Sequence, residues 1–378
     1  MTTIGLYIHI PFCIQKCVYC DFVSVPVLEW IPDYVDALIK EIQMRSRPDI
    51  LVDTIYFGGG TPSILTANQI DTICKAIDDY WQIDARAEIT LEANPGTLSE
   101  EKLQAWQLSG INRLNLGIQS FQDKHLKFLG RIHDVDQAHE AIDRIKHSRI
   151  NNFGLDLMYG IPGQHLNEWI DDLQTAIQYT PNHLSCYSLT YEPGTPLFKA
   201  LQQNFVMPLP DHRVRDMMKA LITIMDQNQF DHYEISNFAS QTEFRSKHNQ
   251  KYWNNVPYLG FGVSAHSFES NTRFYNVSQV NHYIKQLHQN ILPVECSETL
   301  TVDQQMIEAI FLGLRQTEGI PVRVFASRFS CSFTDLFSHV LEDMLESGYI
   351  ELTDYTCRLT QKGLFYLDSI VQQIIDLL

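Results

Sequence analysis

The sequence contains no run of 18 or more apolar residues, so we expect no helix that spans a membrane. Basic residues are also few: 28 Lys and Arg stand against 45 Asp and Glu, giving a formal net charge of -17. Because phosphate binding needs a basic surface, this balance argues against nucleic acid as the main partner. The N-terminal MTTIGLYIHIPF has no Lys or Arg before its apolar run and no small-residue cleavage site, which argues against a signal peptide and predicts a cytoplasmic protein.

The cysteines do not form the pattern of an extracellular disulfide framework. Five of the eight are scattered singly, at positions 74, 186, 296, 331 and 357, and we expect these to be buried small apolar residues. The other three, Cys13, Cys17 and Cys20, follow the pattern C-x3-C-x2-C. This cluster indicates a metal site with one protein ligand fewer than the usual four.

The absence of a fourth protein ligand helps to distinguish a structural zinc site from an iron–sulfur cluster. A structural zinc site would want another Cys or His nearby, but the residue two positions after Cys20 is Phe22. His9 is close in the sequence, yet a strand residue so near Pro11 is poorly placed to reach the metal. A [4Fe–4S] cluster fits better, since thiolates bind three irons and the fourth iron stays open for an exchangeable ligand. Zinc is the alternative.

Short β-branched or aromatic runs alternate with helix-length amphipathic segments through the first half of the chain. The predicted strands cover residues 6–10, 53–57, 88–92, 113–117, 153–158 and 184–189. Six such alternations imply a parallel sheet covered by helices. Because six units are too few for an eight-stranded barrel, we expect an α/β fold with a partial, open (β/α)6 TIM-type barrel; a doubly wound sheet is the alternative.

Polar, Gly-rich and Pro-rich motifs follow the carboxyl end of each predicted strand. In chain order they are IPFC, GGGTPS, EANPG, GIQSF, YGIPG and YEPGT. Barrel and open α/β proteins place their sites at this edge of the sheet. We therefore expect the functional site at the carboxyl ends of the strands.

The strand–helix rhythm stops near residue 235, which predicts three regions. Residues 1–235 form the barrel. Residues 236–298 are rich in aromatic residues, Asn and Gly, and we expect irregular structure packed over the barrel mouth. Residues 299–378 contain helical stretches and a short hairpin, a pattern that resembles a winged helix. Its mixed charge favours a packing or docking module over DNA binding.

The C-x3-C-x2-C motif after a first strand, with the aromatic Tyr19 just before its last cysteine, resembles the radical S-adenosylmethionine (SAM) superfamily. In that superfamily the amino and carboxylate groups of SAM occupy the fourth iron, and the cluster supplies the electron that cleaves SAM. The resemblance implies that Cys13, Cys17 and Cys20 hold a [4Fe–4S] cluster and that the cofactor supplies the missing ligand.

Two strand-end motifs fit a SAM site. The turn Gly58–Thr61 lets a ligand approach the backbone closely because no Cβ intervenes, and it resembles the motif that contacts the SAM amino group. Glu92, in LEANP, would face the mouth and accept hydrogen bonds from ribose hydroxyls or an ammonium group. Without that context, the first is an ordinary turn and the second a surface strand end.

Nearly the whole chain resembles the family of oxygen-independent coproporphyrinogen III dehydrogenase and its heme-chaperone paralogue, through YIHIPFCIQKCVYCDF, FGGGTPS, LEANPG, NLGIQSF, LDLMYGIPGQ and LGFGVSAHS. The resemblance implies that SAM is lined by Tyr7, Tyr19, Gly59, Gly60, Thr61 and Glu92. Gln119, Arg131 and Asp156 match polar positions that bind SAM in the dehydrogenase, where two SAM molecules are seen. A buried Arg131–Asp156 ion pair is the alternative for those two residues.

Three departures from the dehydrogenase favour the heme chaperone. Phe22 stands where the dehydrogenase has a further cysteine, and the first predicted strand begins where the dehydrogenase has an N-terminal extension. The stretch HNQKYW, residues 248–253, matches the H-N-x-x-Y-W motif of the chaperone. The resemblance thus implies a protein that binds heme and transfers it to an acceptor rather than an enzyme. The alternative is the dehydrogenase, which decarboxylates coproporphyrinogen III oxidatively.

His248 is the predicted heme ligand, because imidazole is a good axial ligand for heme iron and Tyr252 and Trp253 offer flat apolar faces. Basic residues nearby that could meet the heme propionates are Arg245, Lys247 and Lys251. The alternative is that this stretch is a hydrogen-bonded cap over the barrel. The resemblance also implies respiratory-chain cytochromes as acceptors, peripheral docking on a membrane, and a homodimer when the cluster is bound.

Overall fold

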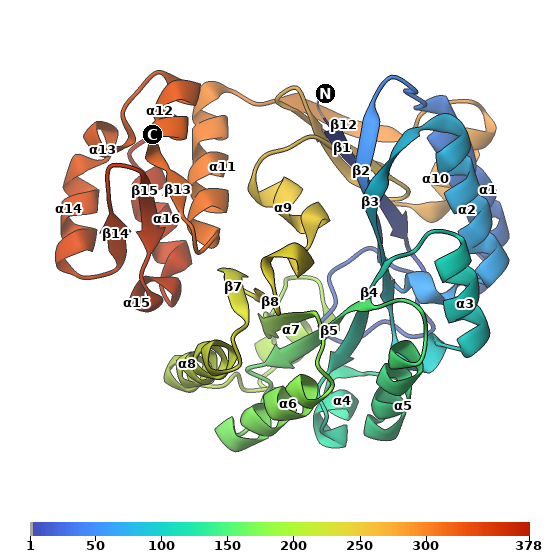
Figure 1. The fold of residues 1–378 in the computed structure, drawn as a ribbon, viewed down its shortest axis with the longest axis horizontal. Helices are drawn as coiled ribbons and strands as arrows, with labels where there is room; N and C mark the ends of the chain where they lie inside the picture. Colours follow the sequence, from blue (N-terminus) through green and yellow to red (C-terminus); the bar gives the residue numbers. More distant parts are fainter. Residues whose placement is uncertain (1–2) are drawn as a thin grey trace.

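The computed structural model describes residues 3–378. Its largest feature is a sheet of twelve strands in the order β12-β11-β10-β9-β1-β2-β3-β4-β5-β6-β8-β7 (Figure 1). The first six strands run parallel, and each pairs with the next along the chain. They are β1 (Thr3–Ile10), β2 (Leu51–Gly59), β3 (Gln82–Ala93), β4 (Arg113–Gln119), β5 (Asn152–Tyr159) and β6 (His183–Ser188).

Helices follow these strands and cover the outer face of the sheet (Figure 1). They are α1 (Ile31–Met44), α2 (Ala67–Tyr80), α3 (Glu100–Leu108), α4 (Asp123–Leu129), α5 (Val135–Lys146), α6 (Leu166–Gln178), α7 (Pro196–Gln202) and α8 (Asp211–Gln227). Single 3-10 turns are η1 (Leu28–Trp30), η2 (Pro62–Ile64), η3 (Pro95–Thr97) and η4 (Thr242–Phe244). Because the strand order is sequential and contains no switch point, the sheet is not doubly wound, and the predicted partial (β/α)6 barrel is confirmed.

Strand β1 shows how the sequence separates an apolar outer face from a polar interior. Ile4, Leu6 and Ile8 alternate along the strand and are buried in the main core. Tyr7 lies between them on the other face, where its ring centroid is 6.2 Å from that of Tyr56 in β2. The side-chain period of two in a strand therefore stabilises the sheet on one face and leaves the other face for the site.

The prediction that residues 236–298 form irregular structure over the barrel mouth is wrong. This segment adds strands to both sides of the parallel sheet, since β9 pairs with β1 and β8 pairs with β6. Its strands escaped the sequence pattern because they are short and interrupted by Gly and Asn. They and their helix are β8 (Asn237–Ala239), β9 (Tyr258–Phe261), β10 (His266–Glu269), β11 (Thr272–Asn276), β12 (Val294–Thr299) and α10 (Val280–His288), next to β7 (Asp231–Glu234).

Helix α9 (Lys247–Trp253), which contains the HNQKYW motif, also lies elsewhere than predicted. The backbone N–H of His248 bonds to Glu88 in β3, and its ring bonds to Thr54 in β2. Thr54 and Glu88 are paired neighbours on the adjacent strands β2 and β3, and both precede the carboxyl-terminal parts of these strands. Helix α9 therefore covers the amino-terminal end of the barrel, opposite the cysteines.

The region from residue 299 onward contains the predicted helices and hairpin, arranged around a small sheet of order β13-β15-β14. Its elements are α11 (Val302–Arg315), β13 (Ile320–Pro321), α12 (Val322–Phe329), α13 (Phe333–Leu336), α14 (Ser338–Glu346), β14 (Ile350–Leu352), β15 (Thr356–Leu359), α15 (Gln361–Leu364) and α16 (Leu367–Ile375). It packs beside the barrel, and Arg215 of α8 donates to the Tyr366 hydroxyl at 2.8 Å. Within residues 3–378, no helix is both long and apolar enough to cross a membrane.

Candidate functional site at the carboxyl end of the barrel

The loop that carries the three cysteines follows β1 and is tied to other segments by backbone hydrogen bonds. Cys13 N donates to the Val25 carbonyl at 3.2 Å, and Val18 N donates to the Leu129 carbonyl at 3.3 Å. The Val18 carbonyl accepts from Leu197 N at 2.9 Å. All three cysteines line one cavity, and every cysteine of the chain is a free thiol. The fold itself therefore holds the thiols together at this end of the barrel.

The donor set around the thiols fits a [4Fe–4S] cluster. Among residues 3–378, no group of three His, Cys, Asp or Glu side chains is placed to hold a single metal ion. A cluster does not need that arrangement, because each thiolate binds a different iron. Arg131 Nη1 lies 3.5 Å from Cys17 Sγ, where a cation favours a thiolate. Burial raises the pKa of the Cys20 thiol, so iron binding would have to displace its proton.

The glycine turn after β2 is packed against the cysteine loop. A Cβ on Gly60 would lie 2.7 Å from the Phe12 carbonyl oxygen and 2.9 Å from that of Ile10. Gly59 has a φ of +108°, and a Cβ there would lie 2.6 Å from the His9 ring. These close approaches explain why the sequence has glycine at both positions. Thr61 follows, with its hydroxyl 3.5 Å from Cys13 Sγ.

Two acidic side chains project into the barrel from neighbouring parts of the sheet. Burial raises the pKa of the Glu92 carboxyl to about 7, although the Tyr56 hydroxyl donates to Glu92 Oε1 at 2.7 Å and works against this rise. Burial also raises the pKa of the Asp156 carboxyl to about 6, partly offset by its hydrogen bond with Ser185. Carboxylates so poorly solvated are ready to accept hydrogen bonds from a cationic ligand.

Arg131 is held by fixed acceptors and still has an unused donor. Its Nη2 donates to Asn94 Oδ1 and to the Gly117 carbonyl, the latter at 2.7 Å. Its Nε is buried without a hydrogen-bond partner among residues 3–378. The alternative interpretation was an ion pair between Arg131 and Asp156. No such ion pair is formed among these residues. An oriented guanidinium that lines the cavity suits a ligand carboxylate.

Gln119 ends β4 in an unusual conformation. Its φ of 70° lies in the left-handed region, and the pairing of β4 with β5 shifts register between Gly117 and Gln119. Non-glycine residues rarely adopt this conformation, and such strain is concentrated at functional sites. The side chain lines the cavity beside Arg131.

A single cavity of about 1050 Å³ joins these groups. Of the residues predicted to bind the cluster or SAM, it is lined by Cys13, Cys17, Tyr19, Cys20, Gly59, Gly60, Thr61, Glu92, Gln119, Arg131 and Asp156. Tyr7 is the exception. Its hydroxyl lies 3.2 Å from His9 Nδ1, and its ring stacks on Tyr56 deeper in the barrel. Tyr7 therefore supports the floor of the site and does not line the cavity.

His248, the predicted heme ligand, lies outside this cavity and is 1% exposed. Its Nδ1 lies 2.8 Å from Thr54 Oγ1 and its Nε2 lies 2.8 Å from the Tyr252 hydroxyl. Burial lowers the pKa of its imidazole to about 3, so the ring is neutral. Because both ring nitrogens are occupied, His248 cannot ligate heme in this conformation. The alternative of a hydrogen-bonded cap is what the structure shows, at the amino-terminal end.

Two of the three basic residues around the motif are also engaged, whereas Lys247 is exposed. Lys251 Nζ forms an ion pair with Asp53 at 2.6 Å. Arg245 contacts Asp231 at 2.6 Å and Glu318 at 2.7 Å. Neither is free to meet a propionate in this conformation.

Several cavity residues were missed at the level of sequence. Asn94 connects the turn to Arg131, since its Nδ2 donates to Thr61 Oγ1 at 3.0 Å and its Oδ1 accepts from Arg131. Its place in LEANP, two residues after Glu92, was a usable signal. Arg215 of α8 and Tyr366 before α16 also line the cavity. No local pattern marks these two, because only the packing of the C-terminal region brings them there.

Comparisons with known proteins agree with this architecture. Residues 7–176 match the radical SAM superfamily, and residues 300–366 match the HemN C-terminal domain. The solved structure of coproporphyrinogen III oxidase (HemN) from Escherichia coli, described as a radical SAM enzyme, superposes with a TM-score of 0.86. That match covers 100% of this chain and 91% of the other at 22% identity, and so it concerns the fold.

Curated relatives narrow the assignment. The heme chaperone HemW of Bacillus subtilis (strain 168) is 36% identical over 363 residues, which cover 94% of this chain and 95% of that protein. The heme chaperone HemW of Escherichia coli (strain K12) is 33% identical over 376 residues, 98% of this chain and 97% of that protein. With such identity over almost the full length of both chains, this chain belongs to the HemW family within the radical SAM superfamily.

Proposed function

We propose that this chain is a heme chaperone, which binds heme and passes it to an acceptor protein while carrying a [4Fe–4S] cluster and SAM. The observation that carries the proposal is the extent of the cavity. Its volume of about 1050 Å³ is at the upper end of the range for a site with one small ligand. It continues from the cysteines past the predicted SAM residues to the C-terminal region.

The inner part of the cavity suits the cluster and SAM. Cys13, Cys17 and Cys20 would bind three irons, and the SAM amino and carboxylate groups would complete the fourth. The turn around Gly60 gives SAM access to backbone groups, Glu92 accepts from its cationic or hydroxyl groups, and the guanidinium of Arg131, which lines the cavity, suits its carboxylate. When bound, the cluster supplies reducing electrons.

The outer part of the cavity suits a flat, largely apolar ligand with acidic groups. Its apolar lining includes Met158, Leu189, Met218, Leu364, Phe365 and Tyr366. Two arginines, Arg215 and Arg315, lie on the same lining. Arg315 is paired with the buried Glu234 at 2.9 Å, whereas Arg215 has no carboxylate partner among residues 3–378. Heme matches this chemistry, since its porphyrin plane is apolar and its propionates are anionic.

Ligation of heme by His248 stays a prediction, and it requires a change in the conformation of the protein. Helix α9 would have to leave the barrel, breaking the bonds of the imidazole to Thr54 and Tyr252. The proposal also includes four further points. They are acceptance of heme by respiratory-chain cytochromes, peripheral docking on a membrane, a homodimer with the cluster bound, and a cytoplasmic location.

The proposal is tested by titrating heme into anaerobically reconstituted protein and following its Soret absorption. We expect one saturable heme site per chain, and transfer of that heme to apomyoglobin added as a probe acceptor. Arg215→Gln should weaken heme binding about tenfold, the loss of one charge-assisted contact. The matched control is Arg86→Gln, because the Arg86 side chain is 92% exposed and Arg86 is absent from the cavity lining.

The same preparation separates the chaperone from the dehydrogenase. Protein, SAM and a reductant are incubated anaerobically with coproporphyrinogen III, and the porphyrins are analysed by mass. The chaperone proposal expects unchanged substrate. Loss of two carboxyl groups per molecule would overturn it, and so would the absence of saturable heme binding.

A further inference from the structure

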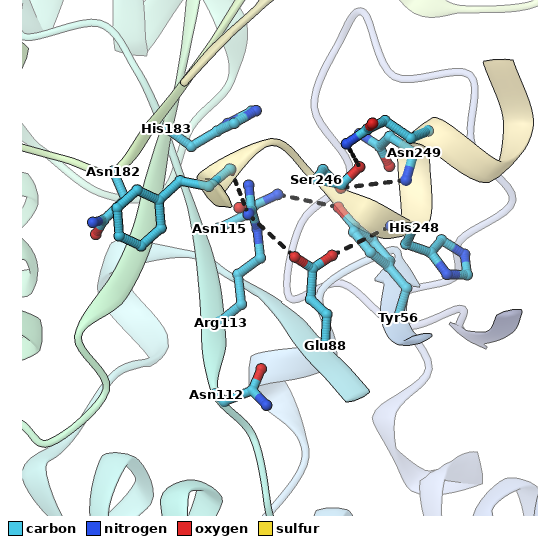
Figure 2. Close-up of polar contacts among 12 residues, drawn as sticks. Tyr56, Glu88, Asn112, Arg113, Asn115, Asn182, His183, Ser246, His248 and Asn249 are labelled. Carbon is cyan, nitrogen blue, oxygen red and sulfur yellow. Dashed lines mark hydrogen bonds and ion pairs between the residues drawn. The ribbon is translucent and has the colours of Figure 1, made fainter. Parts of the chain in front are cut away.

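His248 has a contact that the heme hypothesis does not use. Its ring stacks on the ring of Tyr56, with centroids 5.2 Å apart and planes inclined by 27°. Tyr7 lies on the same stack, with its centroid 6.4 Å from that of His248. Figure 2 shows His248 of helix α9 beside Tyr56, inside the barrel. The imidazole therefore forms part of the surface on which Tyr56 rests.

Tyr56 is in turn the side chain that holds Glu92. Its hydroxyl donates to Glu92 Oε1 at 2.7 Å and accepts from Asn115 Nδ2 at 3.3 Å. Tyr56 comes from β2, and Asn115 from β4 (Figure 2). A flat ring fixed at one end by stacking and at the other by two hydrogen bonds has little freedom to rotate. Tyr56 therefore helps to hold the Glu92 carboxylate, together with a hydrogen bond from the backbone of Gly59.

Helix α9 is anchored tightly enough to act as a fixed support. The His248 N–H donates to Glu88 Oε1 at 3.3 Å, and the other carboxylate oxygen of Glu88 lies 3.4 Å from Arg113 Nη1. Lys251 pairs with Asp53, and Ser246 caps the helix by accepting from Asn249 N at 3.3 Å. Both His248 ring nitrogens are bonded as well. The imidazole thus cannot shift without breaking its hydrogen bonds to Thr54 of β2 and to Tyr252 of the same helix.

Gly5 in β1 makes room for this helix. A Cβ at Gly5 would lie 2.8 Å from Lys251 Cδ, 2.8 Å from Thr54 Oγ1 and 3.2 Å from His248 Cε1. Since the side chains of Thr54 and Lys251 are both fixed by partners, there is little space into which they could move. A methyl group at this position would push α9 away from the barrel without touching Tyr56 or Glu92.

We propose that His248 and Tyr56 form a positioning chain through which helix α9, at the amino-terminal end of the barrel, orients the Glu92 carboxylate at the SAM site. In this chain neither His248 nor Tyr56 needs to contact SAM, and the HNQKYW motif serves the cofactor from the far side of the barrel. The inference rests on the SAM site of the proposed function but not on heme binding.

The test measures SAM affinity of reconstituted protein by equilibrium dialysis, with the electron paramagnetic resonance signal of the reduced cluster as a second readout. We expect Tyr56→Phe, His248→Ala and Gly5→Ala each to weaken SAM binding about tenfold and to reduce the change that SAM makes in the cluster signal. The matched controls are His147→Gln and Tyr355→Phe, whose side chains are exposed and away from the barrel interior. Iron and sulfide content and thermal unfolding are recorded for every variant.

The double variant Tyr56→Phe/His248→Ala distinguishes a positioning chain from two independent effects on SAM affinity. If His248 acts through Tyr56, the double variant should bind SAM about as weakly as the weaker single variant. Losses that multiply, to about a hundredfold, would overturn the proposal, as would single variants that bind SAM like the controls. Loss of heme absorption in His248→Ala with SAM affinity unchanged would overturn it in favour of heme ligation. Absence of heme binding in the wild type would instead defeat the chaperone proposal and leave this one standing.

Discussion

At the carboxyl end of the barrel, Glu92 and Asp156 face a cavity of about 1050 Å³, whereas at the amino end Glu88 accepts a hydrogen bond from the backbone N–H of His248 in helix α9, which covers that end. Both ends carry ionisable groups, and Glu88 and Glu92 lie on the same strand, β3. At the open end the carboxyl groups have raised pKa values, and they and Arg131 line the cavity. At the covered end Glu88 and His248 are bonded to other parts of the chain, although Nε and Nη2 of Arg113 are buried without a hydrogen-bond partner among residues 3–378.

The difference shows that residue type alone does not mark a ligand site. A His, Tyr and Trp in one short motif look like a heme site, yet the structure buries the His248 ring in internal packing and leaves Tyr252 and Trp253 half-buried. What distinguishes the two ends is whether the polar groups line open space, which at the carboxyl end is the cavity. On that criterion the carboxyl end is the candidate ligand site.

The largest effect is expected from removing a cluster ligand. Cys17→Ser should abolish [4Fe–4S] incorporation and, with it, SAM binding, because only two thiolates remain. The measurements are iron and sulfide content and SAM binding after anaerobic reconstitution. Cys296→Ser is the control, since Cys296 is an exposed free thiol on β12. A Cys17→Ser protein with a full cluster would contradict the account of the open end.

The next effect concerns the covered end. Arg113 is fully buried and pairs with Glu88 at 3.4 Å, so Arg113→Met leaves a buried carboxylate without its cation. We expect a loss of about 3–5 kcal/mol in the free energy of unfolding, measured with urea. Arg86→Met, at an exposed position, should change stability by less than about 0.5 kcal/mol. Equal effects of the two substitutions would mean that the covered end contributes little to stability.

A smaller effect is expected at the glycine turn. Gly60→Ala places a Cβ within 2.9 Å of backbone atoms of Phe12 and Ile10, so the cysteine loop must shift. We expect SAM affinity to fall roughly tenfold, about 1.4 kcal/mol. Gly96→Ala is the matched control, because the nearest side-chain atom is 4.0 Å from its Cβ. If both variants bind SAM equally well, the close approach at Gly60 does not matter to the site.

The smallest effect is a pH dependence of SAM affinity. Burial raises the pKa of the Glu92 carboxyl to about 7, so this group is charged mainly above that pH. A carboxylate attracts the cationic groups of SAM, and affinity should therefore rise by a few fold as the pH increases from about 6 to 8. The pKa of Asp156, about 6, contributes at the lower edge of this window. Glu92→Gln should flatten the profile; an unchanged profile in that variant would assign the dependence to another group.

The parallel strands and the cofactor end were predictable from local signals. Alternating apolar residues mark β1 through β6, and each strand end carries a motif with Cys, Gly or a carboxylate. Sequential strands place those ends at one edge of the sheet, which is why eleven of the twelve residues predicted to bind the cluster or SAM line one cavity and only Tyr7 does not. Those of the eleven outside the cysteine loop each lie on, or close to the end of, a regular strand or helix.

The covered end was not predictable in the same way. Helix α9 reaches Thr54 of β2 and Glu88 of β3 through long-range contacts, such as that of His248 with Thr54, 194 residues away in sequence. Nothing within the HNQKYW stretch shows whether its imidazole faces a ligand or a threonine. The prediction that the scattered cysteines are buried is wrong for Cys296, which is exposed, and for Cys331, which is half-buried. Cys296 is exposed because β12 lies at the edge of the sheet. Edge position is set by tertiary pairing and not by local sequence.

The most direct test of the difference between the two ends is hydrogen–deuterium exchange of the reconstituted protein with and without heme. The account predicts that heme slows exchange in α8 and α16, whose residues line the cavity, and leaves α9 as protected as before. Faster exchange in α9 on adding heme, with α8 and α16 unchanged, would contradict it. That result would mean that the helix leaves the barrel and that heme binds at the amino-terminal end.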